Sequence, residues 1–272
     1  MSTSSPTART VLVTGADGRL GLATARLLLA DGATVIAHVL EKDRADETLT
    51  RLQADGVPGR VRMVHADFAR LAEVDELGRT LTAELPQLDA LINAASIPAP
   101  QRRTHTADGH ELTLQVDYLA PRRLTMALAP LVAAGRGRIV TVTSKLHTGG
   151  NIDYADLDRT RAIYTPLAIY AQAKLALTMF SRHLAETGPA GITSVSVHPA
   201  DFELDLPELR SHRTAPVDAA AALLVELSAP STPLHNGGYY IGLEQAIPAA
   251  LVRNSRARAR LAVWSNQLEH AA

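Results

Sequence analysis

A serine, a tyrosine and a lysine stand at spacings that suit proton transfer to an oxygen atom. Tyr170 precedes Lys174 by one helical turn, so the two side chains fall on the same helix face. The pKa of a free tyrosine is about 10, and an adjacent ammonium lowers it by favouring the phenolate. Ser144 ends a β-branched run, where its hydroxyl can hydrogen-bond a substrate oxygen. Together the three residues predict a general acid–base site.

The tyrosine–lysine pair alone is weak evidence, because such a pair is commonly a solvated helix face. Two other tyrosines fit less well, since Tyr164 is followed by Ala168 at the fourth position and Tyr154 by Asp158. The strand-end serine therefore carries much of the argument.

A second pattern favours phosphate binding. Gly15, Gly18 and Gly21 follow the first predicted strand and open a helix. Glycine lets the backbone turn sharply and approach a pyrophosphate, whose charge then lies on the N–H groups at the helix N-terminus. An ordinary strand-to-helix turn is the alternative. The residues of this turn that we predict to contact a dinucleotide are Gly15, Asp17, Gly18, Arg19, Leu20 and Gly21.

Two later strand ends supply further candidate cofactor contacts. Asp67, with Phe68 beside it, can accept from an adenine amino group, although Asp67 could instead cap the helix that follows. Asn93, Ala94 and Ala95 end the fourth predicted strand, where small residues let the backbone pass close to a ribose. Taken alone, this segment is a strand-to-loop transition.

Short apolar runs alternate with amphipathic stretches along the chain, which predicts an α/β fold with a doubly wound parallel sheet covered by helices on both faces. Ligands then bind at the carboxyl ends of the strands. The predicted strands are 10–14, 34–37, 61–65, 88–93, 138–142, 192–197 and 239–241, and the clearest helices are 20–30, 71–85, 112–131, 169–184 and 217–227. Residues 145–167 have no strong pattern.

Composition narrows the class of protein. At 272 residues with 46% apolar residues, the chain suits one domain over residues 10–272, after a disordered tail at 1–9. The absence of cysteine excludes disulfides and thiolate sites, and the ten histidines form no metal-binding pattern. Net charge is −1 without a long basic stripe, which argues against nucleic acid. With no membrane-spanning run, we expect a soluble cytoplasmic protein.

The chain resembles the short-chain dehydrogenase/reductase superfamily, closest to its retinol dehydrogenase-like and WW-domain oxidoreductase-like branch. In that branch the interval between the serine and the tyrosine is longer than in commoner members, and here it is 26 residues. The segments that carry the likeness are Val142-Thr-Ser144 with His147 and Gly150, residues 169–175, Val197-His-Pro199, residues 237–240 and residues 261–265.

The resemblance implies a single-domain Rossmann fold with a seven-stranded sheet, homodimers or homotetramers, and hydride transfer between a nicotinamide and a substrate carbon. Tyr170 is then the proton donor or acceptor, Ser144 holds the substrate oxygen, and Lys174 binds the nicotinamide ribose. Pro199 and the backbone near Phe202 contact the carboxamide end.

Three features depart from the family pattern. Asp117 stands where the family has a catalytic asparagine, and a carboxylate cannot donate a hydrogen bond when ionised. Leu204 replaces a hydroxyl residue that helps to grip the cofactor. The glycine spacing is closer to the extended branch. These departures keep two alternatives open: a non-redox member, such as a dehydratase, epimerase or cyclase, and a non-catalytic cofactor-sensing protein.

The choice of cofactor and substrate is weakly encoded. After the second strand come Leu40, Glu41 and Arg44, and Arg19 in the glycine turn could reach a 2′-phosphate, so NADP(H) is favoured over NAD(H). A mixed apolar and charged segment at 202–215 is the predicted substrate lid. It suits a partly apolar alcohol or ketone, with Leu204 and His147 as candidate contacts. For His147, loop packing is the alternative.

Overall fold

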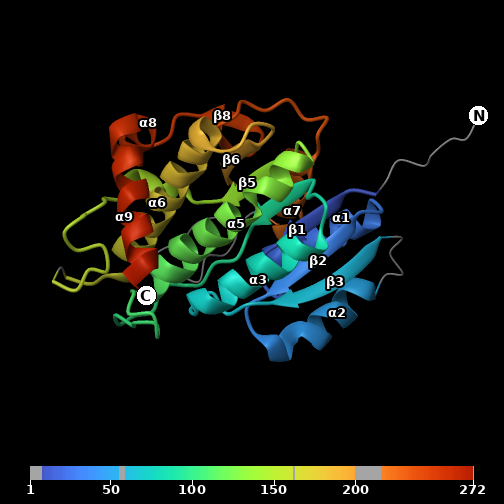
Figure 1. Cartoon of the computed structure of the whole chain (residues 1–272), viewed down its shortest axis with the longest axis horizontal. Helices are drawn as coiled ribbons and strands as arrows, with labels where there is room; N and C mark the ends of the chain where they lie inside the picture. Colours follow the sequence, from blue (N-terminus) through green and yellow to red (C-terminus); the bar gives the residue numbers. More distant parts are fainter. Residues whose placement is uncertain (1–7, 55–58, 162, 200–215, 272) are drawn as a thin grey trace, which may run out of the picture.

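The structure is a computed structural model that describes residues 8–54, 59–161, 163–199 and 216–271 (Figure 1). The proposed lid at 202–215, with Phe202 and Leu204, lies outside these residues, as does most of the proposed tail at 1–9.

A single sheet forms the centre of the molecule, in the order β3-β2-β1-β4-β5-β6-β7-β8. The first seven strands pair in parallel, and β8 pairs with β7 in the antiparallel sense. The strands are β1 Thr10–Val13, β2 Thr34–Val39, β3 Arg60–His65, β4 Ala90–Asn93, β5 Arg138–Val142, β6 Thr193–His198, β7 Tyr239–Ile241 and β8 Glu244–Ala246.

The direction in which successive strands are added to the sheet reverses between β1 and β4, which are adjacent and parallel. The chain adds β2 and β3 on one side of β1 and then crosses to the other side for β4 and the later strands. In an open α/β sheet a ligand crevice forms at such a point, beyond the carboxyl ends of the strands. The doubly wound fold is confirmed. The one difference is the eighth strand, which is too short and polar to give a strand signal in the sequence.

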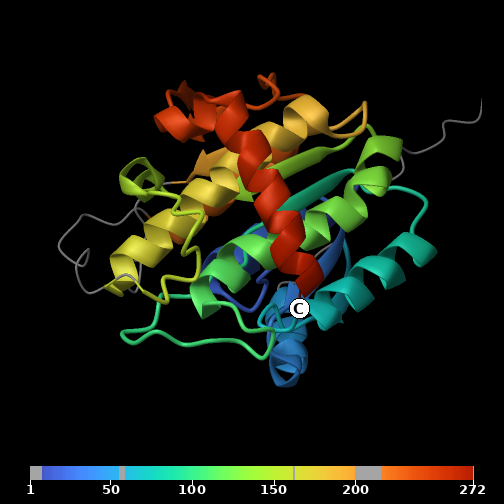
Figure 2. The same ribbon diagram turned by 60° about the vertical axis from the view of Figure 1, so that its left-hand side comes forward.

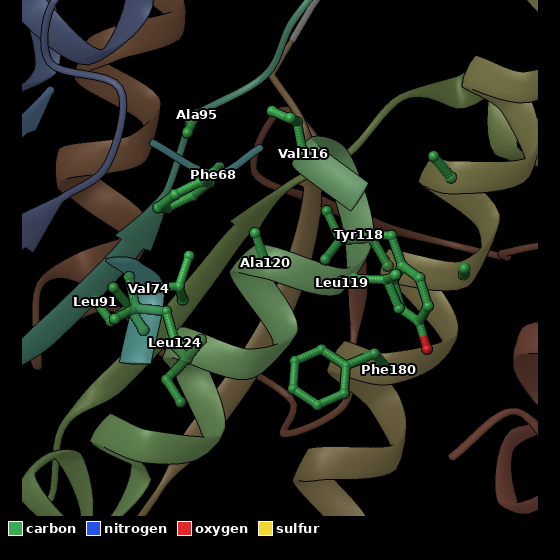
Figure 3. Close-up of a cluster of buried hydrophobic side chains, with 14 of the residues drawn as sticks. Phe68, Val74, Leu91, Ala95, Val116, Tyr118, Leu119, Ala120, Leu124 and Phe180 are labelled. Atoms are coloured by element: carbon green, nitrogen blue, oxygen red, sulfur yellow. The ribbon is translucent and has the colours of Figure 1, made fainter. Parts of the chain in front are cut away.

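Helices cover both faces of the sheet, as the alternating pattern predicted. Two buried apolar clusters separate the layers: one packs α3, α5 and α6 against the sheet, and the other packs α1 and α7 on the opposite face. Figure 3 shows part of the first cluster, in which Val74 and Leu91 lie near Leu124 of α5. The main helices are α1 Arg19–Ala30, α2 Ala45–Gln53, α3 Leu71–Glu84, α5 Ala120–Ala134, α6 Pro166–Thr187, α7 Val217–Ser228 and α9 Ser255–Ala271.

The predicted helix over 112–131 contains a wide turn. It comprises α4 (Leu112–Leu114), a π-helical turn η2 (Gln115–Leu119) and α5 in direct succession. A π turn accommodates one extra residue and is frequent at functional sites. Every residue of η2 is buried, and Asp117 is at its centre.

The segment 145–167 follows β5 as a 3₁₀ turn, η3 (Lys145–Gly149), and then runs in turns until Pro166 begins α6. Thr165 caps α6 by accepting from the N–H of Ala168, and Pro166 suits the first helical position. The catalytic tyrosine and lysine of the prediction therefore lie in the first half of a 22-residue helix.

Helix α2, helix α9 and the single helical turn before α9 are not among the helices predicted from the sequence. Helix α9 follows the single turn α8 (Ala250–Arg253) and lies across α5 and α6 (Figure 2). Its Leu261 is buried in the first apolar cluster, where Trp264 and Leu268 also pack.

Candidate active site

The glycine turn is built so that its backbone can lie close to a ligand. Gly15 has φ +69°, a conformation that favours glycine, and a Cβ there would lie 2.7 Å from Cα of Ala95. A Cβ on Gly21 would lie 2.1 Å from the carbonyl oxygen of Gly15. Gly18 is the N-cap of α1 and offers no side-chain cap, and the first turn holds no acidic residue. The α1 N-terminus can therefore receive an anion.

The end of β4 lies against this turn. Thr14 accepts at Oγ1 from the N–H groups of Ala94 and Ala95, at 3.0 and 3.1 Å. These contacts fix the two alanines at the switch point between β1 and β4. Ala94 and Ala95 both line the central cavity.

The predicted acid–base residues converge on the other side of the same cavity. Thr143 and Ser144 are the two residues that follow the last residue of β5. Thr143 Oγ1 donates to the carbonyl oxygen of Lys174 at 3.2 Å, and this hydrogen bond joins the end of β5 to α6. The Ser144 side chain hydrogen-bonds Tyr170. The ammonium of Lys174 lies 5.3 Å from the centroid of the Tyr170 ring. The three side chains are together, as the sequence predicted.

Asp117 joins this group from the π turn. Its Oδ2 lies 3.1 Å from Nζ of Lys174 and accepts from Oγ of Ser96 at 2.6 Å. Its Oδ1 accepts from the N–H of Ile97 at 3.0 Å. Asp117 is fully buried and Lys174 is 2% exposed, so this is a buried ion pair.

The pKa of Tyr170 does not shift in the expected direction. Burial raises the pKa of Tyr170 most strongly. The Lys174 ammonium lowers it, as predicted, and the Ser144 hydrogen bond also lowers it, but the Asp117 charge raises it and the net direction is upward. For Lys174, burial would lower the pKa, yet the charges of Asp117 and Tyr170 together raise it, so the ammonium keeps its proton.

One cavity of about 520 Å³ connects the glycine turn with the acid–base group. Its wall combines charged residues with apolar residues such as Ile97 and Val142. The residues that line it are Gly15, Asp17, Gly18, Arg19, Leu20, Gly21, Leu40, Glu41, Arg44, Ala94, Ala95, Ser96, Ile97, Pro98, Val142, Thr143, Ser144, Tyr170, Lys174, His198 and Pro199.

Besides Asp117, four predicted site residues within the described part of the chain do not line this cavity. Asp67 accepts at Oδ1 from the N–H of Ala69 at 2.8 Å and so forms a turn before α3. It does not cap that helix, because the N-cap of α3 is Arg70. Phe68 is fully buried. Asn93 donates to Oγ1 of Thr125 at 2.9 Å. Their side chains support the strand ends around the cavity.

His147 is the fourth of these residues. It is fully buried, its Nδ1 lies 2.7 Å from the carbonyl oxygen of Ser144, and its Nε2 accepts from the N–H of Ala249 at 3.2 Å. Burial lowers its pKa, which suits a neutral ring. These contacts favour loop packing over the substrate contact considered from the sequence.

Several cavity residues were not among the predicted site residues, including Ser96, His198 and Arg44. Ser96 has no motif signal, because it follows the strand end as one loop residue among many. His198 lies in a segment that carried only the family likeness. Arg44 was noted among the residues after β2, and the structure places it 3.8 Å from the Asp17 carboxylate at the cavity edge.

A family model described as short chain dehydrogenase matches residues 9–213. The chain belongs to the short-chain dehydrogenase/reductase family. The polyprenol dehydrogenase of Mus musculus is 32% identical over 96% of this chain and 83% of its own length. Retinol dehydrogenase 14 of Mus musculus is 36% identical over 73% of this chain and 62% of its own length. These relatives place the chain in the retinol dehydrogenase-like branch of the family.

A solved structure supports the same assignment. A blue fluorescent protein from a metagenomic library, in complex with NADPH, has a TM-score of 0.67 and 26% identity, over 86% of this chain and 97% of that chain. This short-chain dehydrogenase/reductase is therefore an NAD(P)-dependent oxidoreductase in its general class. None of the helices within the described residues has the length and apolarity to cross a bilayer. Within those residues, no group of side chains is arranged to hold a metal ion.

Proposed function

We propose that this oxidoreductase interconverts a carbonyl and an alcohol on a partly apolar small molecule, with Tyr170 as the proton donor or acceptor. The observation that carries the proposal is that Ser144, Tyr170 and Lys174 line the same cavity as the glycine turn. A bound dinucleotide and a substrate oxygen can therefore meet within one 520 Å³ space.

The cavity residues fit a nicotinamide dinucleotide. The glycine turn leaves room where a Cβ would clash, and the capless N-terminus of α1 suits a pyrophosphate. Ala94, Ala95 and Lys174 would hold the ribose on the nicotinamide side, with Pro199 beyond them. When bound, this cofactor gives or takes the hydride. The protein's part is to orient the substrate oxygen with Ser144 and to exchange a proton at Oη of Tyr170.

We assign the cofactor as NADP(H) in preference to NAD(H). Arg19 and Arg44 both line the cavity near the end of β2, where a 2′-phosphate would add negative charge. Glu41 lines the same region and opposes this preference. The NADPH complex of the similar metagenomic protein also supports it.

The cofactor assignment predicts a change in selectivity. Arg19→Ala and Arg44→Ala should each weaken NADPH binding more than NADH binding, by about tenfold for a lost charge-assisted hydrogen bond. Arg51→Ala is the matched control, because Arg51 pairs with Glu47 on α2 and does not line the cavity. An unchanged NADPH/NADH affinity ratio in both cavity variants would count against NADP(H).

The proposed substrate is a lipid-like or polycyclic alcohol or ketone. The cavity wall includes Leu40, Ile97, Pro98 and Val142 beside the polar acid–base group. The names of the two relatives, a polyprenol dehydrogenase and a retinol dehydrogenase, point to long or ring-bearing apolar alcohols. We extend the proposal to a cytoplasmic homodimer or homotetramer, which cell fractionation and light scattering test.

The deciding experiment combines binding and turnover. Purified protein is titrated with NADPH and NADH, and a panel of apolar ketones and alcohols is then assayed for cofactor oxidation or reduction. Tyr170→Phe should retain cofactor binding and lose turnover by about a hundredfold or more, the usual contribution of a general acid. Tyr154→Phe is the matched control, since Tyr154 contacts Ala257 of α9. Tight binding without turnover on any substrate would favour the non-redox alternative.

A further inference from the structure

The carboxylate of Asp117 is paired and hydrogen-bonded inside the protein. Its carboxylate is fully buried and receives three partners: the ammonium of Lys174, the hydroxyl of Ser96 and the N–H of Ile97. Burying an ionised carboxylate is costly unless it is paired and hydrogen-bonded, and here it is both.

The three side chains form a closed ring. Lys174 donates from Nζ to Oγ of Ser96 at 3.1 Å, and Ser96 in turn donates to Oδ2 of Asp117. Asp117 completes the ring through its contact with Nζ of Lys174. The Lys174 ammonium therefore contacts both the Ser96 hydroxyl and the Asp117 carboxylate. An amide at position 117 would lack the charge that balances it.

We propose that Asp117 is a positioning residue which, with Ser96, clamps the Lys174 ammonium and makes the site electrically neutral while Tyr170 carries its proton. This inference rests on the proposed function of Tyr170 as the proton-exchanging group. The family has an asparagine at this position. Here the Asp117 carboxylate balances the charge of the Lys174 ammonium within the site.

Within the described part of the chain, few charged groups other than this pair face Tyr170. Lys174 faces it from its own helix and Asp117 faces it from η2. His147 from η3 is buried, and burial lowers its pKa. His198 at the end of β6 lines the same cavity, while Asp17, Arg19, Glu41 and Arg44 line the part formed by the glycine turn and the end of β2. Asp117 is thus the acidic group that opposes Lys174 at the phenol.

The consequence for catalysis is a phenol that stays protonated to higher pH. Carbonyl reduction needs Tyr170 as a proton donor, so the clamp extends the pH range of reduction upward. Alcohol oxidation needs the phenolate as the proton acceptor, so the same clamp confines oxidation to more alkaline pH. Asp117→Asn should move both pH profiles toward lower pH.

The test follows the phenol itself, in protein without cofactor. Tyrosine labelled with ¹³C at Cζ gives six signals for the six tyrosines, and Tyr170→Phe assigns the relevant one. Wild type and Asp117→Asn are titrated from neutral pH to the onset of alkaline unfolding. We expect the Tyr170 signal of the variant to titrate at lower pH than that of the wild type.

Glu111→Gln is the matched control. Glu111 is another fully buried carboxylate, and Tyr164 donates to it at 3.2 Å. Burial raises the pKa of Tyr164 most strongly, and the charge of Glu111 raises it further, so this variant should shift the Tyr164 signal to lower pH and leave Tyr170 unchanged. Circular dichroism confirms folding, and Asp117→Ser is the second neutral variant if the asparagine variant does not fold.

The outcomes separate the two proposals. A Tyr170 signal with the same titration in wild type and in the folded neutral variant overturns the clamp, as does a wild-type midpoint below that of free tyrosine. A lowered midpoint in the variant supports the clamp even if no substrate turns over, in which case the proposed function alone fails. With a substrate, a pH profile displaced to lower pH in the variant is the expected kinetic signature.

Discussion

At the scale of single residues, His38 shows how a buried side chain can shape a binding turn without touching the ligand. Its Nδ1 accepts from the N–H of Gly15 at 3.3 Å, and Nε2 lies 3.0 Å from the carbonyl oxygen of Ala66, to which it donates in this tautomer. The ring stacks on Phe68 with centroids 4.6 Å apart. His38 thereby joins the glycine turn to the end of β3.

The protonation of His38 predicts a pH-dependent stability. Burial lowers its pKa to about 4, whereas an unfolded histidine titrates at about 6.5. Because the folded pKa is the lower one, the stabilisation is complete above pH 6.5 and is lost as the pH falls toward 4. The loss should be on the order of 3 kcal/mol in the free energy of unfolding. His38→Gln should remove this part of the pH dependence, as measured by urea unfolding at several pH values.

The control for that measurement is His235→Gln. His235 is exposed, so its replacement should leave the pH dependence of unfolding as in the wild type. An acid-induced loss that is equally large in His38→Gln would assign the pH dependence to other groups.

At the scale of elements, the turn η3 places the serine of the acid–base group. His147 ties this turn to the segment before α8 through Ala249, and its ring packs edge-on against Tyr239 with centroids 4.7 Å apart. The 3₁₀ turn therefore depends on a contact about a hundred residues away in the chain. Local sequence could not reveal that contact.

We expect His147→Ala to act through Ser144. The variant leaves the N–H of Ala249 without its partner, which should lower the free energy of unfolding by about 1–3 kcal/mol. It should also lower kcat, because Ser144 loses a support, with the affinity for NADPH unchanged. Thr148→Ala is the control within the same turn, since Thr148 is exposed. A raised substrate KM at unchanged stability would instead show that His147 contacts substrate.

At the scale of the whole molecule, α9 supports the helix that carries Tyr170 and Lys174. It crosses α5 and α6 in Figure 2, and Ser265 lies 2.5 Å from the hydroxyl of Tyr118. Arg258 forms an ion pair with Glu186 near the end of α6. Tyr154 from the segment before α6 donates to the carbonyl oxygen of Ala257 at 3.1 Å. The C-terminal helix and the long serine-to-tyrosine segment therefore brace each other.

This bracing predicts a stability cost for a single substitution in α9. Leu261 is 2% exposed, so Leu261→Ala should lower the free energy of unfolding by about 2–5 kcal/mol through a cavity in the core. Val263→Ala on the same helix should change it by less than about 0.5 kcal/mol, because Val263 is 56% exposed. Urea unfolding measures both. Equal effects would mean that α9 is not docked as the structure shows.

Periodicity and glycine placement in the sequence were enough to predict the doubly wound sheet, its parallel strands and the glycine turn. Strand alternation and helix length are local properties, so these predictions were confirmed over most of the chain. Strand β8 was not predicted because it is short and polar. Helix α9 was not predicted because its apolar residues have no regular pattern. Their pairing partners β7 and α6 are what hold them in place.

The sequence by itself determined which residues stand at strand ends and helix faces, and hence that Ser144, Tyr170 and Lys174 meet. Only the tertiary structure decided which charges surround them. The pKa of Tyr170 depends on burial and on Asp117, a residue 53 positions earlier that reaches the site through a π turn. His147 likewise has a partner, Ala249, that only folding brings near. Electrostatic energy depends on distance in space and on burial, and sequence spacing fixes neither.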